Sequence, residues 1–159
     1  MKGNQKLLGV LNELLADELT AISQYMVHSE MCDSWGFEQL HKQIEHQAKE
    51  EMHHAEWLIG RILFLEGQPT VSKLHPIRIG KSVAEIIGND EEAELGAIKA
   101  YNAAISLAGE VADGSTGDLL TTIVKMEENH YDWGRKQRSL IKQMGLENYL
   151  TLQGEGEAK

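Results

Sequence analysis

The 159-residue sequence contains one cysteine and two prolines, and no long uninterrupted hydrophobic run. A single cysteine, Cys32, cannot form an internal disulfide and has no Cys-x-x-Cys partner, which excludes a rubredoxin-type iron site and suits a reducing compartment. No stretch approaches the ~20 apolar residues that a membrane-spanning helix needs, and the opening residues MKGNQK lack the apolar core of a signal peptide. We therefore expect a cytoplasmic protein without a membrane partner.

Basic residues are also scarce, because 25 acidic residues outnumber 15 lysines and arginines and the formal net charge is −10. Nucleic acid is disfavoured as a partner, since its phosphates require basic patches. An acidic surface attracts small cations, although charge alone fits a surface kept for solubility better. The length and the 42% hydrophobic content suit one domain. We assign it to residues 1–153, followed by a polar tail, residues 154–159, which we expect to be disordered.

Four long segments carry apolar residues at alternating spacings of three and four, the pattern of one helix face. The third begins with a capping box, Ser82 to Glu85, and the fourth stops at Gly145, before a short fifth helix. The predicted helices cover about residues 5–33, 37–66, 82–112, 115–144 and 146–152.

The connections between these segments predict the topology. Short turns at residues 34–36 and at Gly114 make the first and second helices, and the third and fourth, antiparallel neighbours. Residues 67–81 contain both prolines and, stretched at ~3.3 Å per residue, reach about 50 Å, the length of a ~28-residue helix. This link can cross the whole bundle. We predict an all-α fold, a four-helix bundle with one long crossover that leaves the second and third helices parallel.

Four glutamates occupy stripe positions that otherwise hold Leu, Ile and Tyr. A buried, unpaired carboxylate costs several kcal/mol, comparable to the stability of a whole domain, so something must neutralise them. Two of the four have a histidine three residues on, which places each pair on one helix face. The residues are Glu18, Glu51 with His54, Glu94, and Glu127 with His130.

A lone Glu-x-x-His is a weak signal, because Glu38 with His41 and Glu50 with His53 also match it. The spacing discriminates between them. The two glutamates in each half of the chain are 33 residues apart, and an offset of 76 residues maps the first ligand triad onto the second. The same offset pairs Tyr25 with Tyr101, whereas a frame shifted by one residue does not repeat. The sequence therefore predicts a doubled helical hairpin whose pseudo-two-fold axis brings both triads together.

The six residues suit two divalent cations. Four carboxylates supply four negative charges, two divalent ions balance them, and two neutral imidazoles complete a mixed oxygen and nitrogen shell that can be buried. Such ligands suit iron or manganese, and zinc would also bind. Glu51 and Glu127 are the expected bridging ligands, with Glu18 and Glu94 terminal. The repeat disfavours the alternative that all six form surface salt bridges.

Several stretches along nearly the whole chain resemble the bacterioferritins. They are the opening MKG, QYMVHSEMCDSWG, EEMHHAE, RILFLEGQP, EENHYDW and GLENYL. The resemblance implies a ferritin-like bundle whose six matching residues form a ferroxidase centre, where oxygen or peroxide oxidises iron(II). It also implies a hollow shell of twenty-four identical subunits built from dimers, which stores a ferric mineral, and a ferredoxin that assists iron release.

The resemblance assigns further residues. Met52 matches an axial ligand of a b-type or related haem, and in a dimer two copies of this methionine hold one haem iron. Met52 lies about 100° round the helix from Glu51. His46 and Glu50 match an auxiliary iron site. Tyr25 and Trp133 match aromatic residues near the centre that could donate electrons, although core packing explains both equally well.

Other classes of protein share this bundle. A rubrerythrin-like peroxidase usually adds a cysteine-rich domain, and a manganese catalase is longer. A DNA-protecting mini-ferritin oxidises iron between subunits, and this chain has no basic tail. A haem and iron carrier whose bundle metals are only structural stays as the non-enzymatic alternative.

Overall fold

The computed structural model describes residues 1–154 of the chain, and its regular structure over that range is entirely helical. All but the first residue of the predicted disordered tail, residues 155–159, lies outside the described residues. The five helices are α1 (Gln5–Ser34), α2 (Glu38–Phe64), α3 (Val83–Glu110), α4 (Gly114–Met144) and α5 (Leu146–Thr151). The all-α prediction is confirmed, and the helix ends differ from the predicted ones by a few residues at most.

Side-chain caps explain where three of the helices begin. Asn4 accepts a hydrogen bond from the Leu7 N–H at 3.1 Å, and Ser82 accepts one from the Glu85 N–H at 3.2 Å. The Glu85 carboxylate accepts from the N–H of Lys81, one residue before the position expected for a capping box. Asp113 caps α4, which therefore begins at Gly114 and slightly earlier than predicted.

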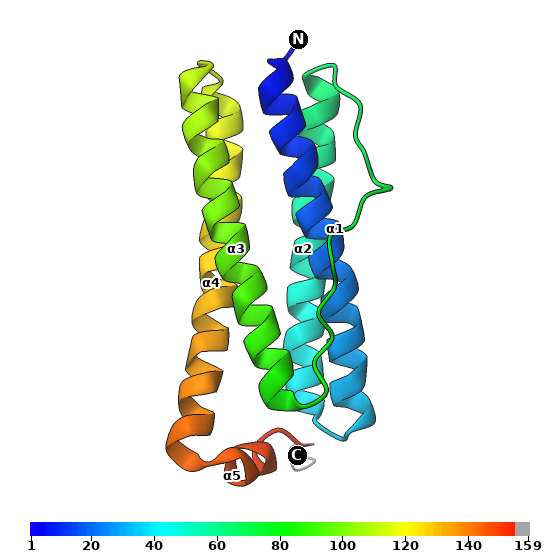
Figure 1. Ribbon diagram of the computed structural model, residues 1–159, viewed down its shortest axis with the longest axis vertical. Helices are drawn as coiled ribbons and strands as arrows, with labels where there is room; N and C mark the ends of the chain where they lie inside the picture. Colours follow the sequence, from blue (N-terminus) through cyan, green and yellow to red (C-terminus); the bar gives the residue numbers. More distant parts are fainter. Residues whose placement is uncertain (155–159) are drawn as a thin grey trace, which may run out of the picture.

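The helices form two antiparallel hairpins, α1 with α2 and α3 with α4, which meet mainly through α1 and α3 (Figure 1). The chain between α2 and α3 returns along the length of the bundle before α3 begins, so α2 and α3 run in the same direction. This is the predicted four-helix bundle with one long crossover. The short α5 packs at the end of α4.

Side chains of α1 hold the crossover in place, at intervals that follow one helix face. Asn12 contacts the backbone of residues 68 and 70, and Thr20 Oγ1 accepts from the His75 N–H at 2.9 Å. Further along, Gln24 accepts from the Arg78 N–H and His28 Nε2 from the Gly80 N–H. These contacts satisfy backbone groups of a segment that has no regular structure of its own.

Two apolar clusters fill the bundle, one towards each end. The first contains apolar side chains, mostly leucine, isoleucine and alanine, from residues 7–15, 55–65, 101–108 and 120–124. The second gathers residues 25–32, 40–48, 83–87 and Tyr149 of α5. Along every long helix, the charged stripe residues lie between these two clusters. The fold thus places these charged residues in one layer in the middle of the bundle, between the two apolar clusters.

In the part of the chain that the structure describes, no helix combines the length and apolar character needed to cross a membrane.

Candidate metal centre

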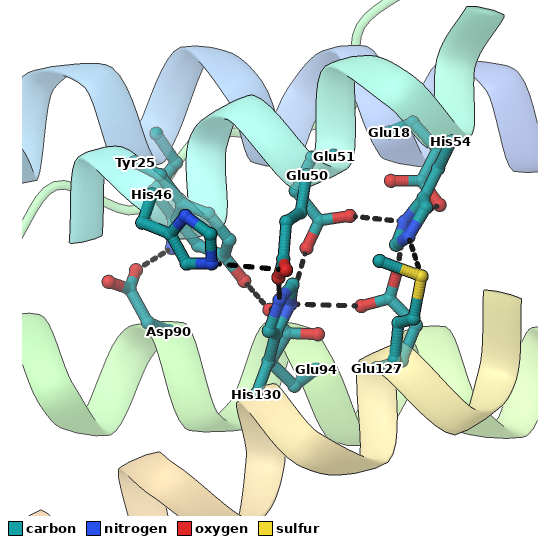
Figure 2. A network of polar contacts seen from close by, with 12 residues as sticks. Glu18, Tyr25, His46, Glu50, Glu51, His54, Asp90, Glu94, Glu127 and His130 are labelled. Carbon is teal, nitrogen blue, oxygen red and sulfur yellow. Dashed lines mark hydrogen bonds and ion pairs between the residues drawn. The ribbon is translucent and has the colours of Figure 1, made fainter. Parts of the chain in front are cut away.

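The six predicted ligands come together in the middle layer of the bundle, although they belong to four different helices (Figure 2). Each is at most 5% exposed. They meet there because each of the six side chains lies on the face of its helix that points into the bundle. They are Glu18 of α1, Glu51 and His54 of α2, Glu94 of α3, and Glu127 and His130 of α4.

Glu51 and Glu127 each face both histidines. One oxygen of Glu51 lies 2.9 Å from His54 Nδ1 and the other 2.9 Å from His130 Nδ1. The oxygens of Glu127 lie 2.8 Å from His54 Nδ1 and 3.7 Å from His130 Nδ1. Each carboxylate therefore spans the two halves of the cluster, which is the placement a bridging ligand requires.

Glu18 and Glu94 have only one histidine neighbour each. Glu18 lies 3.6 Å from His54 Nδ1, and Glu94 lies 3.4 Å from His130 Nδ1. The structure thus contains two overlapping groups of four donors, each with its donor atoms within 4.8 Å of one another. The groups are Glu18, Glu51, His54 and Glu127, and Glu51, Glu94, Glu127 and His130.

The cluster is electrostatically incomplete without cations. Burial, with repulsion from neighbouring carboxylates, holds the pKa of Glu51 and of Glu94 well above the usual range. Burial also opposes ionisation of Glu127, but its contacts with Glu94 and with both histidines outweigh that effect and hold the Glu127 pKa well below its usual range. Burial would lower the pKa of His54, yet the carboxylates of Glu127 and Glu18 raise it to about 9. Burial and mutual repulsion therefore disfavour the ionised forms of Glu51 and Glu94 when no cation is bound.

Donor geometry also fits metal ions better than hydrogen bonding alone. The Nδ1 atom of His54 faces three carboxylates, but one N–H cannot serve all three. Among residues 1–154, no hydrogen-bond partner reaches the buried Oε2 of Glu94, and Glu127 Oε1 lies near His54 Nδ1 without hydrogen-bond geometry. Oxygen and imidazole donors aimed at two common points suit first-row divalent ions such as iron and manganese.

A second layer of side chains contacts the ligands. The Tyr25 hydroxyl donates to Glu94, and the Tyr101 hydroxyl donates to Glu18. Behind the histidines, His130 Nε2 contacts the Glu50 carboxylate, and His54 Nε2 lies 3.3 Å from Met126 Sδ. All four of these neighbours come from the opposite helical hairpin, as the pseudo-two-fold repeat leads one to expect.

The remaining predicted residues lie outside the ligand set. Met52 is 44% exposed on α2 and does not join the cluster. His46 Nε2 lies 3.1 Å from Glu50 Oε1, and its side chain is exposed (Figure 2). Trp133 is half-buried and packs against the second apolar cluster, without a described contact to a ligand. Tyr25 does reach the centre, through its contact with Glu94.

Two contacts were missed from the sequence, although the repeat contained a signal for both. Tyr101 is the equivalent of Tyr25 at the 76-residue offset, so its contact with Glu18 follows from the symmetry. Met126 is the equivalent of Glu50 in the same way. A buried network in which Gln24 and His28 both contact Asp90 at 2.8 Å was also missed, since no repeat marks it.

A cavity of about 360 Å³ adjoins the cluster and is lined by Glu18, Glu94 and Tyr25 at its inner end. It extends to the exposed side chains of Arg78 and Glu92, beneath the crossover. The cavity therefore lies between the buried centre and exposed side chains beside the crossover.

One further group of donors, Glu30, His41 and Glu45, lies towards the surface of α1 and α2. His41 and Glu45 are half-buried and Glu30 is exposed, so their charges can be solvated without a metal ion.

Comparison with known proteins agrees with this geometry. A family model described as a ferritin-like domain matches residues 8–144. The chain belongs to the ferritin-like family. A bacterial ferritin from Synechocystis sp. is 42% identical over 154 residues, which cover 96% of this chain and 99% of that protein. A bacterioferritin from Rhodobacter capsulatus is 39% identical over 152 residues, which cover 96% of this ferritin-like chain and 94% of the relative. The predicted resemblance is thereby confirmed.

Proposed function

We propose that this chain oxidises iron(II) at a two-metal centre and stores the ferric product inside a cytoplasmic protein shell. The observation that carries the proposal is the pair of overlapping donor groups that share Glu51 and Glu127. Relatives named bacterial ferritin and bacterioferritin support iron as the metal. The ligand charge supports two divalent ions, because four carboxylates balance four positive charges.

The proposed reaction uses iron(II) as substrate at both positions. Two iron(II) ions lose one electron each, and these two electrons with two protons convert one O2 to H2O2, or one H2O2 to two waters. Glu51 and Glu127 hold the two ions close together, so that both electrons are available to one oxidant molecule. The cavity that ends at Arg78 and Glu92 supports access for the ions and the oxidant.

Rapid mixing of the metal-free protein with iron(II) in the presence of oxygen tests the proposal. We expect fast oxidation that saturates at two irons per chain and is abolished in Glu18→Ala and in His130→Ala. Glu30→Ala is the matched control, because it removes a glutamate from the surface donor group instead. Fast oxidation that persists in both ligand variants would show that the centre has only a structural role, as in the non-enzymatic alternative.

We further propose that the subunits assemble into a shell of twenty-four copies. The α1–α2 hairpin carries large apolar side chains that are exposed in the single chain, and such surfaces mark interfaces between proteins. They include Met26, Trp35, Met52, Trp57, Leu63 and Phe64. A native mass of about 430 kDa by light scattering, twenty-four times the 17.8 kDa of one chain, would support this assembly. The resemblance adds a ferredoxin as the reductant for iron release.

Haem binding through Met52 is a second proposed function. The exposed Met52 thioether suits one axial position of haem iron, with a second copy across a dimer supplying the other. Protein produced with ample haem should show haem absorbance, which Met52→Ala should lose. Met52→His should keep bound haem with shifted bands, because imidazole replaces the thioether. Equal haem content in Met52→Ala and wild type would refute this role.

A further inference from the structure

The two metal positions of the proposed centre have matching ligands but different groups behind their histidines. At the Glu94 position, His130 Nε2 contacts the carboxylate of Glu50. At the Glu18 position, His54 Nε2 lies 3.3 Å from the thioether sulfur of Met126. Figure 2 shows the Glu50 carboxylate beside His130 and a sulfur atom, in yellow, beside His54.

Glu50 and Met126 are equivalent positions in the two halves of the chain. They are 76 residues apart, the same offset that relates the ligands themselves. Both are half-buried, and each approaches a histidine of the opposite hairpin. The six proposed ligands therefore match at the 76-residue offset. The outer pair does not, because one half of the chain has a carboxylate at this position and the other half has a thioether. The outer pair therefore gives the two metal positions one defined chemical difference.

A carboxylate and a thioether act differently on an imidazole ligand. When Nδ1 binds a metal, the N–H at Nε2 donates a hydrogen bond, and an ionised carboxylate is a strong acceptor. This contact orients the ring and makes it a stronger donor to the metal, with effects of about 10- to 100-fold on metal affinity. A thioether sulfur is a weak acceptor and carries no charge.

We propose that Glu50 makes the Glu94 position the tighter of the two divalent-metal sites, and that Met126 leaves the Glu18 position the weaker. This inference rests on the proposed two-metal function. Glu50 acts through His130, so it is a positioning residue and not a ligand. The centre then fills in a fixed order, and oxidation, which needs both ions, depends on occupancy of the weaker position.

His46 offers a competing role for Glu50. Its Nε2 lies 3.1 Å from the other oxygen of Glu50, and its side chain is 65% exposed, so the pair could hold an ion of its own at the surface. The two roles make different demands on His46. Support of His130 needs only the Glu50 carboxylate, whereas an ion shared between His46 and Glu50 needs both side chains.

Cobalt(II) titration of the assembled, metal-free protein, followed by visible absorbance, tests the inference without iron oxidation. We expect two binding steps separated by about 10- to 100-fold in affinity. Removal of a terminal ligand identifies each step. Glu94→Ala should abolish the tight step, and Glu18→Ala should abolish the weak one.

Substitution of a residue that contacts a histidine Nε2 atom should then change the affinity of only one of the two cobalt-binding steps. Glu50→Gln should weaken the tight step about tenfold or more, and Met126→Glu should tighten the weak step by a similar factor. Glu56→Gln, which makes the same charge change at an exposed position on α2, is the matched control. A gain of affinity cannot arise from a damaged fold, so Met126→Glu keeps the test decisive if Glu50→Gln assembles poorly. His46→Gln should leave both steps unchanged.

Three results would overturn the inference while leaving the two-metal function intact. They are two wild-type steps of equal affinity, a Glu50→Gln effect no larger than that of Glu56→Gln, and a His46→Gln effect as large as that of Glu50→Gln. A failure of the wild-type protein to bind two cobalt ions per chain would instead refute the proposed centre itself.

Discussion

Two tyrosines each donate a hydrogen bond to one of the carboxylates predicted to be terminal ligands. Tyr101 donates to Glu18 and Tyr25 donates to Glu94, and both hydroxyls are buried with the cluster. Burial, together with the facing carboxylates, holds the pKa of each tyrosine well above its usual range, so both keep their protons as donors. Their immediate structural role is to orient a ligand, whether or not Tyr25 also donates electrons.

Tyr101→Phe should weaken cobalt(II) binding at the Glu18 position by about tenfold, because the carboxylate loses the contact that orients it. Tyr25→Phe should have the same effect at the Glu94 position. Cobalt titration measures both. Tyr149→Phe is the control, since that buried tyrosine bonds to Gln137, away from the centre. Equal affinities in all three variants would show that the phenols do not support the ligands.

Cys32 should be unreactive in the folded protein. Its side chain is fully buried, and burial raises the pKa of the thiol to about 12. At pH 8 the thiolate fraction is about 10⁻⁴, so modification by a disulfide reagent should be at least ~100-fold slower than in denaturant. Complete modification of native protein within minutes at pH 8 would contradict this.

At the scale of single elements, the end of the crossover depends on close contact with α3. A Cβ atom added to Gly80 would lie 2.5 Å from the backbone nitrogen of Ile86, which cannot move without disturbing the start of the helix. Gly80 also donates its backbone N–H to the buried His28. Gly88, by contrast, lies within α3 and has open space around it.

Gly80→Ala should therefore destabilise the fold by about 1–3 kcal/mol, because the new methyl group overpacks a backbone contact. Gly88→Ala should stabilise it by about 0.5–1 kcal/mol, because alanine loses less backbone entropy in a helix. Chemical denaturation followed by circular dichroism compares the two variants with wild type. The two changes in the free energy of unfolding should have opposite signs. An unchanged free energy in Gly80→Ala would show that the crossover can shift to make room for the methyl group.

For the whole molecule, metal binding at the proposed buried centre should increase stability. Metal ions that bind only the folded chain stabilise it by mass action, by about 2.7 kcal/mol at 100 times the dissociation constant. Zinc(II), which does not undergo oxidation, should raise the thermal unfolding midpoint, and a chelator should reverse the rise. Glu94→Ala should reduce the rise, since it removes a ligand at one position. A midpoint unaffected by zinc at saturating concentration would indicate that the centre does not take divalent ions.

Much of this architecture could be predicted from spacing along the chain. Periodic apolar residues are sufficient to locate helices, because burial of one stripe dominates their stability. Gly67 to Lys81 had enough length to cross the bundle, and the crossover does so. The six candidate ligands followed from glutamates on apolar stripes and from the 33- and 76-residue spacings. Their convergence in space, from four helices, matches that prediction.

Contacts between side chains of neighbouring helices could not be predicted in the same way. The repeat relates Glu50 to Met126, but only the folded chain shows that these two side chains lie behind His130 and His54. The network around His28 and Asp90 depends on where the irregular crossover rests, and no periodicity describes such a segment. Periodic sequence specifies the faces of helices because backbone geometry repeats. Contacts across those faces depend on packing in three dimensions, which distinguishes two candidate metal positions that the ligand spacings alone make identical.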